Sequence, residues 1–247
     1  MNRPSGVKAK TKVPANSFSR PLSVVLLPRP KFGSGKSVVQ ALQERRTIRD
    51  IREKKIPLQV LSNLLWAAYG INRSRGPFGI PGRTAASASN SQEIDLYVIL
   101  QEGSFLYDAL HHSLVPVFEG DLRRLAIGSG QADLASGAPV HLLYVVDINR
   151  LANTAGYQEP GLQDSEIQKS YYFVDTGMIA GNVYLFSASL GLAAWFHNCD
   201  RSALASNLHF RTDRRVLFAQ TVGYPSGKLV KELRVRSRKT SRSTMRE

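Results

Sequence analysis

The sequence predicts an α+β fold in which one sheet lies at the centre and helices pack around it. Three observations support this class. Predicted helices outnumber predicted strands, the strands lie far apart in the sequence, and 43% of the 247 residues are hydrophobic against 21% charged, as in ordinary soluble globular proteins. A chain of this length can bury one large core, and its unbroken patterning favours a single domain.

In the first half of the chain, apolar spacing predicts helices separated by one clear strand. The first helix carries Val38, Val39 and Leu42 on one side, and Pro57 suits the first position of the second helix. The elements expected in this half are, in order, a helix at Ser37–Arg46, a helix from Pro57 to near Gly70, a loop at Asn72–Arg83, a strand at Ile94–Leu100, and two helices at Phe105–His112 and Asp121–Ile127.

One long helix dominates the second half. Gly191 is expected to end it, and Asp200 is a typical N-cap for a short helix that follows. The elements expected here are a strand at His141–Val146 closed by Asp147, the long helix from Ser165 to Leu190, a strand at Leu192–Phe196, a helix at Asp200–Leu208, and a last strand at Val216–Val222.

The longest uncharged stretch, Thr176–Cys199, has the length of a membrane span. It contains several polar residues, and Gly191 leaves too little helix before it to cross a bilayer. We therefore expect a buried helix followed by a buried strand, and no membrane partner.

The formal net charge of +14 is carried by the two ends of the chain. Residues 1–55 hold 14 Lys and Arg against 3 Asp and Glu, residues 228–247 hold 8 against 2, and residues 56–227 hold 11 against 14. We expect a basic, partly disordered segment at 1–35, one domain at 36–227 and a basic tail at 228–247. Basic tails bind polyanions non-specifically, but nucleic acid is an unfavoured partner because the body is mildly acidic.

No secretory signal is expected, because the apolar stretch Leu22–Leu27 is short and is broken by Arg29 and Lys31. This favours a cytoplasmic location. The single cysteine, Cys199, excludes a disulfide framework and a multi-cysteine metal site within one chain. The five histidines form no ligand-spaced pair apart from the adjacent His111 and His112, so no metal site is expected.

Three arginines and a hydroxyl follow the first helix, in the string Arg45-Arg46-Thr47-Ile48-Arg49. A guanidinium donates hydrogen bonds in a fork that matches phosphate oxygens, so this string is a candidate dianion site. By itself the string is a weak signal, because a solvated basic surface is the usual meaning of such a pattern.

Two further segments complete the pattern. Small and polar residues run from Gly82 to Gln92 directly before a strand, where Ser87, Asn90 and Gln92 offer hydrogen bonds to a flat ligand. In the long helix, Asp175-x-Gly177-x-x-x-Gly181-Asn182 places two glycines one turn apart on one face, which permits close helix packing.

In this order, the three segments resemble the FMN-dependent nitroreductase family, and more closely its SagB-type dehydrogenase branch. The resemblance covers roughly residues 36–225 and depends on order and spacing. It implies a central, mostly antiparallel sheet flanked by helices and an intertwined homodimer with each FMN at the subunit interface. It also implies hydride transfer from NADH or NADPH to FMN and reduction of a small organic acceptor of the nitroaromatic or quinone type.

The resemblance assigns cofactor-binding roles to particular residues. Arg45, Arg46, Thr47 and Arg49 match the family's segment at the FMN phosphate and ribityl chain. Ser87, Asn90 and Gln92 match its flavin-packing loop, although Ala86 and Glu93 stand where proline is usual. His197 and Asn198 are expected near the flavin N5 edge, and Gly223 matches the glycine after the last strand. Lys228, Arg234 or Arg236 completes the phosphate site, and the sequence does not choose among these three. No catalytic side chain is expected, since the flavin performs the chemistry.

Two alternatives stay open. An azoline-oxidising dehydrogenase acting on a modified peptide is associated with a Lys-Tyr pair before the central helix. Here Lys169 is followed by Ser170 and then by Tyr171 and Tyr172, so the pair is imperfect. From another class, the protein could bind polyanions through its basic ends.

Overall fold

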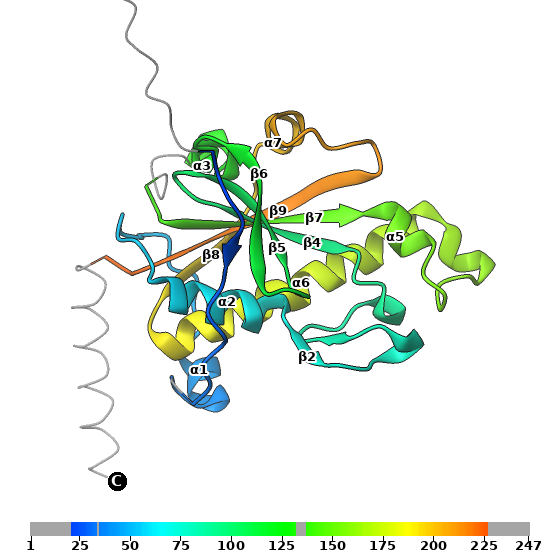
Figure 1. The fold of residues 1–247 in the computed structure, drawn as a ribbon, viewed down its shortest axis with the longest axis horizontal. Coiled ribbons are helices and arrows are strands. Elements are labelled where there is room, and N and C mark those ends of the chain that lie inside the picture. The colour runs from blue at the N-terminus through cyan, green and yellow to red at the C-terminus, as the bar shows by residue number, and fades with distance from the viewer. Residues whose placement is uncertain (1–20, 34, 132–136, 227–247) are drawn as a thin grey trace, which may run out of the picture.

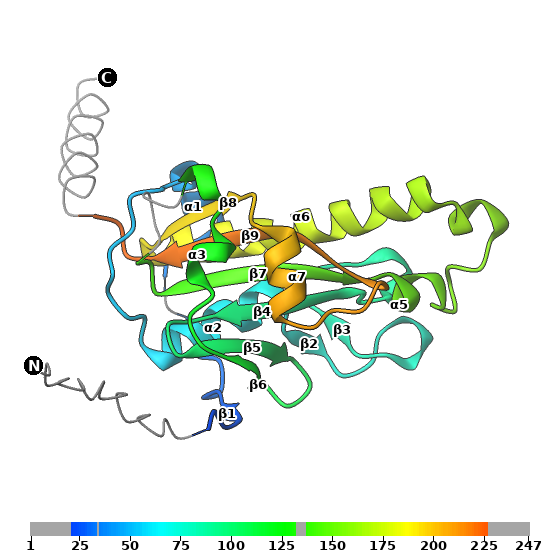
Figure 2. The same ribbon diagram turned by 90° about the horizontal axis from the view of Figure 1, so that it is seen from above.

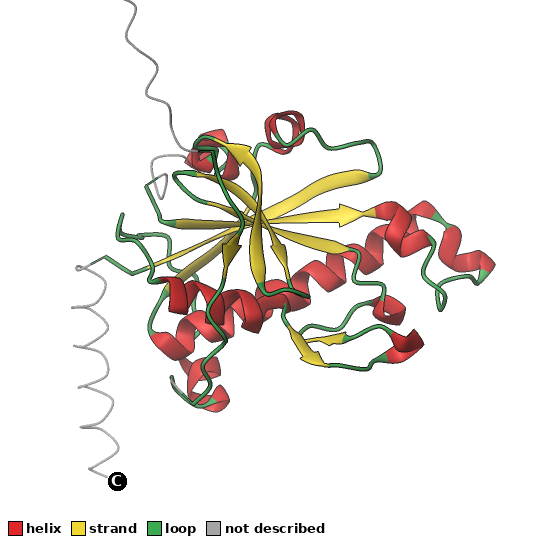
Figure 3. Cartoon of the chain, in the orientation of Figure 1, coloured by secondary structure: helices red, strands yellow, loops and turns green. Residues whose placement is uncertain are grey.

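A computed structural model describes residues 21–33, 35–131 and 137–226. The α-helices in these ranges are α1 (Val38–Glu44), α2 (Leu58–Tyr69), α3 (Arg123–Ala126), α5 (Ile148–Ala152), α6 (Ser165–Leu190) and α7 (Arg201–Asn207); Figure 3 draws them in red together with short 3-10 turns. The strands are β1 (Val25–Leu26), β2 (Ile71–Arg73), β3 (Gly82–Arg83), β4 (Ile94–Ile99), β5 (Gly103–Asp108), β6 (Ser113–Glu119), β7 (Val140–Asp147), β8 (Ala193–His197) and β9 (Arg214–Gly223).

Seven strands form the central sheet in the order β1-β6-β5-β4-β7-β9-β8, and every neighbouring pair is antiparallel (Figure 1). Strands β2 and β3 form a separate two-stranded sheet. The predicted α+β class with a mostly antiparallel sheet is therefore confirmed. Strand β8 forms one edge of the large sheet, which leaves that edge free to receive another segment.

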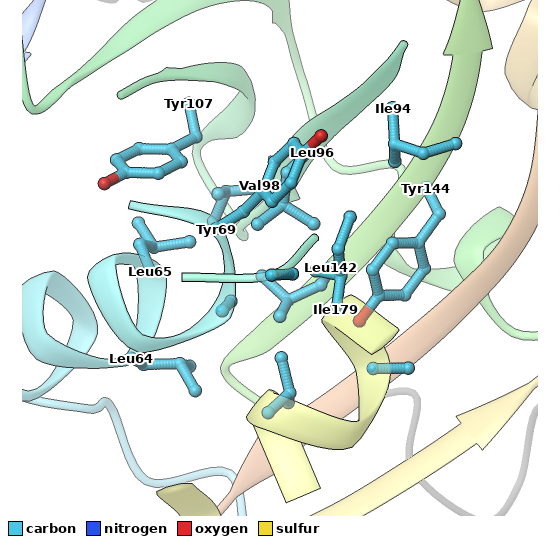
Figure 4. Close-up of a cluster of buried hydrophobic side chains, with 14 of the residues drawn as sticks. Leu64, Leu65, Tyr69, Ile94, Leu96, Val98, Tyr107, Leu142, Tyr144 and Ile179 are labelled. Atoms are coloured by element: carbon cyan, nitrogen blue, oxygen red, sulfur yellow. The ribbon is translucent and has the colours of Figure 1, made fainter. Parts of the chain in front are cut away.

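Both faces of the sheet are covered by helices, with α2 and α6 on one face and α3 and α7 on the other (Figure 1). Alternate residues of β7 serve the two cores: Leu142 and Tyr144 face α2 and α6, whereas Leu143 and Val145 face α7. This double burial explains why the middle strands are apolar on both faces. Figure 4 shows the larger core, where Leu64 and Leu65 of α2 meet the sheet and Ile179 of α6.

The predicted long helix is confirmed as α6, whose ends carry the expected signals. At its start, the Asp164 carboxylate accepts hydrogen bonds from the backbone N–H groups of Glu166 and Ile167. At its end, Gly191 adopts φ +68°, a left-handed conformation that side chains with a Cβ rarely adopt. The expected N-cap of α7 is also confirmed, because the Asp200 carboxylate accepts from the Ala203 N–H at 3.0 Å.

The helix expected at Phe105–His112 is wrong, because this range forms β5 and the turn into β6. Phe105 and Tyr107 alternate into the large core while Leu106 packs on the opposite side, and a short apolar run of this kind fits a two-sided strand as well as a helix. The expected loop at Asn72–Arg83 contains the small β2–β3 hairpin.

Two expectations concern the ends of the chain. The sequence predicts that residues 1–35 precede the domain. Within that range, Val25 and Leu26 form strand β1, which pairs with β6, so these two residues belong to the central sheet. The basic ends at 1–20 and 227–247 lie outside the described residues, and with them the phosphate-site candidates Lys228, Arg234 and Arg236. In the described part of the chain, no helix is long and apolar enough to cross a membrane.

Leu142 lies at the centre of the sheet and is fully buried, whereas Leu110 in the β5–β6 turn is 69% exposed. We expect Leu142→Ala to lower the free energy of unfolding by about 2–5 kcal/mol, because it leaves a cavity between β7 and α6. Leu110→Ala should change it by about 0.5 kcal/mol or less. Urea unfolding measures both, and similar losses in the two variants would contradict this description of the core.

Candidate functional site

The arginine segment lies along the free edge of the sheet. It leaves α1 at Arg45, and the Ile48 backbone N–H donates to the Ala194 carbonyl of β8 at 3.0 Å. The chain then reaches the residues that follow β9, where Ile51 and Pro225 form an isolated antiparallel bridge. One backbone hydrogen bond and one isolated bridge therefore hold this stretch against the edge of the sheet.

Aromatic residues beneath the segment set the directions of its polar side chains. The Arg45 guanidinium lies 5.5 Å from the ring of Tyr184 on α6, and that of Arg49 lies 5.6 Å from the ring of Trp195 on β8. The Thr47 hydroxyl is 3.1 Å from the Tyr184 hydroxyl, which also accepts the Phe196 backbone N–H. One tyrosine of α6 therefore ties the segment to the edge strand.

The charges of this segment are unpaired within the described residues. Arg45, Arg46 and Arg49 are exposed, and no carboxylate there forms an ion pair with any of them. Arg46 donates only to the backbone carbonyl of Glu44. Three guanidiniums without counterions attract an anion, and their fork geometry suits a phosphate.

A cavity of about 460 Å³ opens beyond the end of β8. Its lining comes from Asn198 and the two residues after it, and from Gly128, Gly130 and Gln131 after α3. The predicted Asn198 is thus placed at a hollow large enough for part of a small molecule. Sequence analysis missed the second wall, for which the string Gly128-Ser-Gly-Gln131 was the only available signal.

The imidazole of the predicted His197 points away from this cavity into the protein. It is 6% exposed, and its Nδ1 lies 2.8 Å from the Asn198 carbonyl, which can only accept, so Nδ1 carries the proton. The Nε2 atom of His197 then accepts a hydrogen bond from the Thr221 hydroxyl at 2.7 Å. The oxygen of that hydroxyl lies 2.9 Å from Nδ1 of His141. Burial lowers the pKa of both histidines, that of His141 to about 3, so the pair is neutral and anchors the backbone at Asn198.

Gly223 has a packing role at the same edge. A Cβ at this position would lie 2.4 Å from the Ile51 side chain and 3.0 Å from Pro139. The missing side chain lets the arginine segment close against β9. The predicted Gly223 therefore lies against Ile51, and its lack of a side chain leaves room for this close approach.

The predicted loop Ser87–Gln92 lies elsewhere, at the opposite half of α6. Asp175 accepts the Ala88 backbone N–H at 2.9 Å, whereas Tyr184 holds the arginine segment nine residues further along the helix. The two parts are therefore separated by about 14 Å of helix within one chain. The structure places Arg45–Arg49 against β8, the strand that ends one residue before Asn198, and places the loop at the other half of α6.

The polar side chains of this loop are occupied in holding its shape. Ser87 Oγ accepts the Gln92 backbone N–H at 3.0 Å, and the Asn90 amide donates to the Pro77 and Ile80 carbonyls. The Gln92 amide donates to Asn90 Oδ1 and Pro81 O, and its oxygen accepts from Arg83. A flat ligand would therefore meet a prearranged surface.

Two buried carboxyl groups support the loop from below. Glu93 is fully buried, and its pKa is raised to about 8 by desolvation and by the neighbouring Asp175 carboxylate. The Ser91 hydroxyl donates to Glu93 Oε2 at 2.6 Å. Burial also raises the pKa of Asp175. At neutral pH the pair therefore retains a proton on Glu93.

Comparisons with known proteins give the family. The model described as the nitroreductase family matches residues 42–224. The chain belongs to the nitroreductase family. A protein of Methanocaldococcus jannaschii classed as a nitroreductase is 28% identical over 158 residues, which cover 61% of this chain and 73% of that protein.

Solved structures agree on the nitroreductase fold. A protein from Ralstonia eutropha JMP134 classed as a nitroreductase is 34% identical, with a TM-score of 0.72, and the match covers 83% of this chain and 90% of that one. The NADPH:FMN oxidoreductase from Vibrio harveyi is 19% identical, with a TM-score of 0.52 over 76% of this chain and 69% of that one, which shows a shared fold. In the described part of this nitroreductase-family chain, no cluster of three metal-ligating side chains is found.

The protonated Glu93 makes stability depend on pH. The unfolded carboxyl ionises near its ordinary pKa of 4.5, whereas the folded one keeps its proton to about 8. Between these values the unfolded state alone releases the proton, so the free energy of unfolding falls as pH rises. Glu93→Gln has no carboxyl to ionise and so removes this decrease in stability. At pH 8 we expect its free energy of unfolding to exceed that of the native chain by about 1–4 kcal/mol.

Thermal denaturation at pH 5 and pH 8 measures this effect. The stabilising effect of Glu93→Gln should grow with pH, whereas the exposed Glu102→Gln should show no such growth. An advantage of Glu93→Gln that is equal at both pH values would contradict a proton held on Glu93.

Proposed function

We propose that this chain is an FMN-dependent oxidoreductase that uses NADH or NADPH to reduce a small organic acceptor of the nitroaromatic or quinone type. Membership of the nitroreductase family supports the oxidoreductase class. The observation that supports the cofactor is the row of guanidiniums at Arg45, Arg46 and Arg49, without ion pairs in the described residues, along β8, the strand that leads to the cavity at Asn198.

The residues present fit a flavin mononucleotide. The guanidiniums and the Thr47 hydroxyl are donors suited to a phosphate monoester, and they lie exposed along the edge of the sheet. The cavity has a backbone rim at Gly130, where a Cβ would meet nothing within 4 Å, so a flat ring can approach closely. The Asn198 amide offers both a donor and an acceptor there.

The chain's own residues would bind and orient, while bound FMN would supply hydride and electron transfer. The arginines would neutralise the phosphate and fix the register of the cofactor along β8. The neutral His197 would hold the peptide at Asn198 in place through its Nδ1–H bond. The Cys199 thiol is not assigned a role, since burial raises its pKa to about 11 and keeps it protonated.

We also infer a homodimer, because the two halves of the predicted site lie nine residues apart along α6 within one chain. A two-fold axis across this helix would bring the Ser87–Gln92 loop of one protomer toward the arginine segment of its partner. The outer face of α6 is suited to such contact. Phe173, Val174 and Met178 are 41–54% exposed, and a Cβ at Gly177 or Gly181 would meet nothing within 4 Å.

Helix α1 extends the same apolar surface. Its Val38, Val39 and Leu42 are 57–69% exposed, and α1 packs beside the C-terminal half of α6. Exposed aliphatic residues on two neighbouring helices are unusual for a monomer and typical of a subunit interface.

Neither alternative gains support from the described residues. For azoline oxidation, Lys169 is ion-paired with Glu166 at 2.9 Å, and Tyr171 packs edge-on against Tyr157. No arrangement there favours a peptide substrate over a small acceptor. The basic ends that would bind polyanions lie outside the described part of the chain. A chain without residues 1–20 and 234–247 that retains FMN and reductase activity would show that these ends are accessory.

The cofactor proposal is tested by an absorbance scan and by FMN titration. The protein should absorb as oxidised flavin, bleach anaerobically on addition of NADH or NADPH, and recover when a nitroaromatic or quinone is added. Arg45→Gln and Arg49→Gln should each weaken FMN binding about tenfold or more, since each removes a charged donor. Arg211→Gln, an exposed arginine remote from β8, is the matched control. A protein that does not bind FMN after reconstitution would contradict the proposal.

The dimer is tested by sedimentation. Val174→Glu and Met178→Glu place charges on the outer face of α6 and should shift the protein toward the monomer, with weakened FMN binding. Leu110→Glu, which changes a hydrophobic residue of the β5–β6 turn that is 69% exposed, should leave the dimer intact. A native chain that sediments as a monomer with FMN bound would contradict the inferred interface.

A further inference from the structure

A separate cavity of about 490 Å³ is lined by residues next to the β2–β3 hairpin and by residues of and after α5, elements that lie in the right-hand half of both Figure 1 and Figure 2. One wall is formed by Phe78, Ile80 and Arg83. Gln92 from the loop forms the floor, and Arg150 with Ala155 forms the facing wall. It shares no residue with the cavity at Asn198.

Backbone strain is concentrated around this cavity. Of the six non-glycine residues with positive φ in the described ranges, Phe78 at 59° and Gln92 at 52° line it, and Ser89 at 49° and Asn90 at 56° lie just before Gln92 in the same loop. Each such conformation costs roughly 1 kcal/mol or more and persists only where surrounding contacts enforce it. Strain of this kind gathers at sites that bind ligands.

The two arginines of the cavity differ in their charge environment. Arg150 is neutralised by Asp95 at 2.9 Å and Asp147 at 3.4 Å, and it also donates to the Gln92 carbonyl. Arg83 donates to Gln92 Oε1 at 2.5 Å and to the Tyr69 carbonyl at 3.0 Å, and it lies 4.3 Å from the Tyr69 ring. Among the described residues no carboxylate pairs with Arg83, so its positive charge is available to a ligand.

The apolar part of the cavity is exposed yet fixed in place. Phe78 is 57% exposed and Ile80 is 41% exposed, although both are large hydrophobic residues. The Phe78 ring packs so closely on Gly156 that a Cβ there would lie 2.5 Å from it. An exposed aromatic ring held in a strained conformation next to an unpaired guanidinium forms a surface for a flat ligand that carries an anionic group.

We propose that this cavity binds a flat, apolar molecule bearing a carboxylate or phosphate, with the ring against Phe78 and Ile80 and the anion at Arg83. The assignment rests on the proposed function, because the anion would belong either to the electron acceptor or to the nicotinamide donor. It makes Arg83 a specificity-determining residue that favours anionic over neutral ligands of equal size.

The test compares matched ligands on matched variants of the full chain. 4-Nitrobenzoate and neutral 4-nitrobenzamide represent the acceptor, and NADPH and NADH represent the donor; binding is measured by calorimetry on the FMN-loaded protein. Arg83→Gln removes the charge, and Ala155→Glu places a carboxylate on the facing wall at an exposed position. Ala155→Gln and Arg211→Gln are the controls.

Both Arg83→Gln and Ala155→Glu should weaken binding of 4-nitrobenzoate about tenfold or more and leave that of neutral 4-nitrobenzamide unchanged, or should weaken binding of NADPH by this factor and leave that of NADH, which lacks the 2′-phosphate, unchanged. Selective loss of 4-nitrobenzoate assigns the cavity to the acceptor, and selective loss of the preference for NADPH assigns it to the donor. Equal effects on charged and neutral ligands, or no effect, overturn the proposal. So does an effect of Arg83→Gln on FMN affinity as large as that of Arg49→Gln, since the anion would then be the cofactor.

Benzoate titrated into the chain without FMN keeps this test separate from the proposed function. Binding that depends on Arg83 would support the anion site even if FMN uptake failed. Loss of benzoate binding in every variant, the controls included, would overturn it.

Discussion

Helix α6 is the constraint on which the remainder of the structure depends. Its inner face packs on the sheet, where the Ala180 carbonyl accepts from the Gln220 amide of β9, and beside α2, where Asn182 donates to the Ala68 carbonyl. Polar groups along it then hold the two parts of the candidate site, Asp175 at the loop and Tyr184 at the edge strand. A rigid rod of 26 residues therefore fixes the distance between them. It also forces a single chain to present these parts separately.

Elements with strong local signals could be predicted from the sequence. Asp164 and Gly191 bound α6 through capping chemistry that acts within a few residues, and the apolar run of β7 is bounded by Asp147. The hairpin at β5 and β6 could not be predicted, because Phe105 and its neighbours are apolar on both sides and burial of both faces is a property of the assembled sheet. Whether such an apolar run forms a strand or a helix depends on pairing across the sheet, and a local sequence pattern does not contain that information.

The candidate site likewise contains residues that could be predicted from the sequence and residues that could not. The arginine segment could be recognised because charge and spacing survive in the sequence, and the structure adds that its guanidiniums are unpaired. Gln131 and its neighbouring glycines meet Asn198 only through the fold, so no spacing rule connects them. The burial of His197 likewise depends on Thr221 and His141, on strands far away in the sequence. Side-chain direction at a strand end is set by such partners.

Charge placement carries more information here than total charge. The net +14 suggests a polyanion-binding protein, yet residues 56–227 are slightly acidic, and Arg150 and Arg214 there are neutralised by Asp95 and Asp147. Other described arginines, Arg52 and Arg75 among them, also lack a carboxylate partner in the described residues, so a missing partner does not by itself mark a site. Arg83 is distinguished because it lines a cavity, and the arginine segment because it lies along β8, the strand that leads to the cavity at Asn198. These are two separate places, as recognition of two different anionic groups requires.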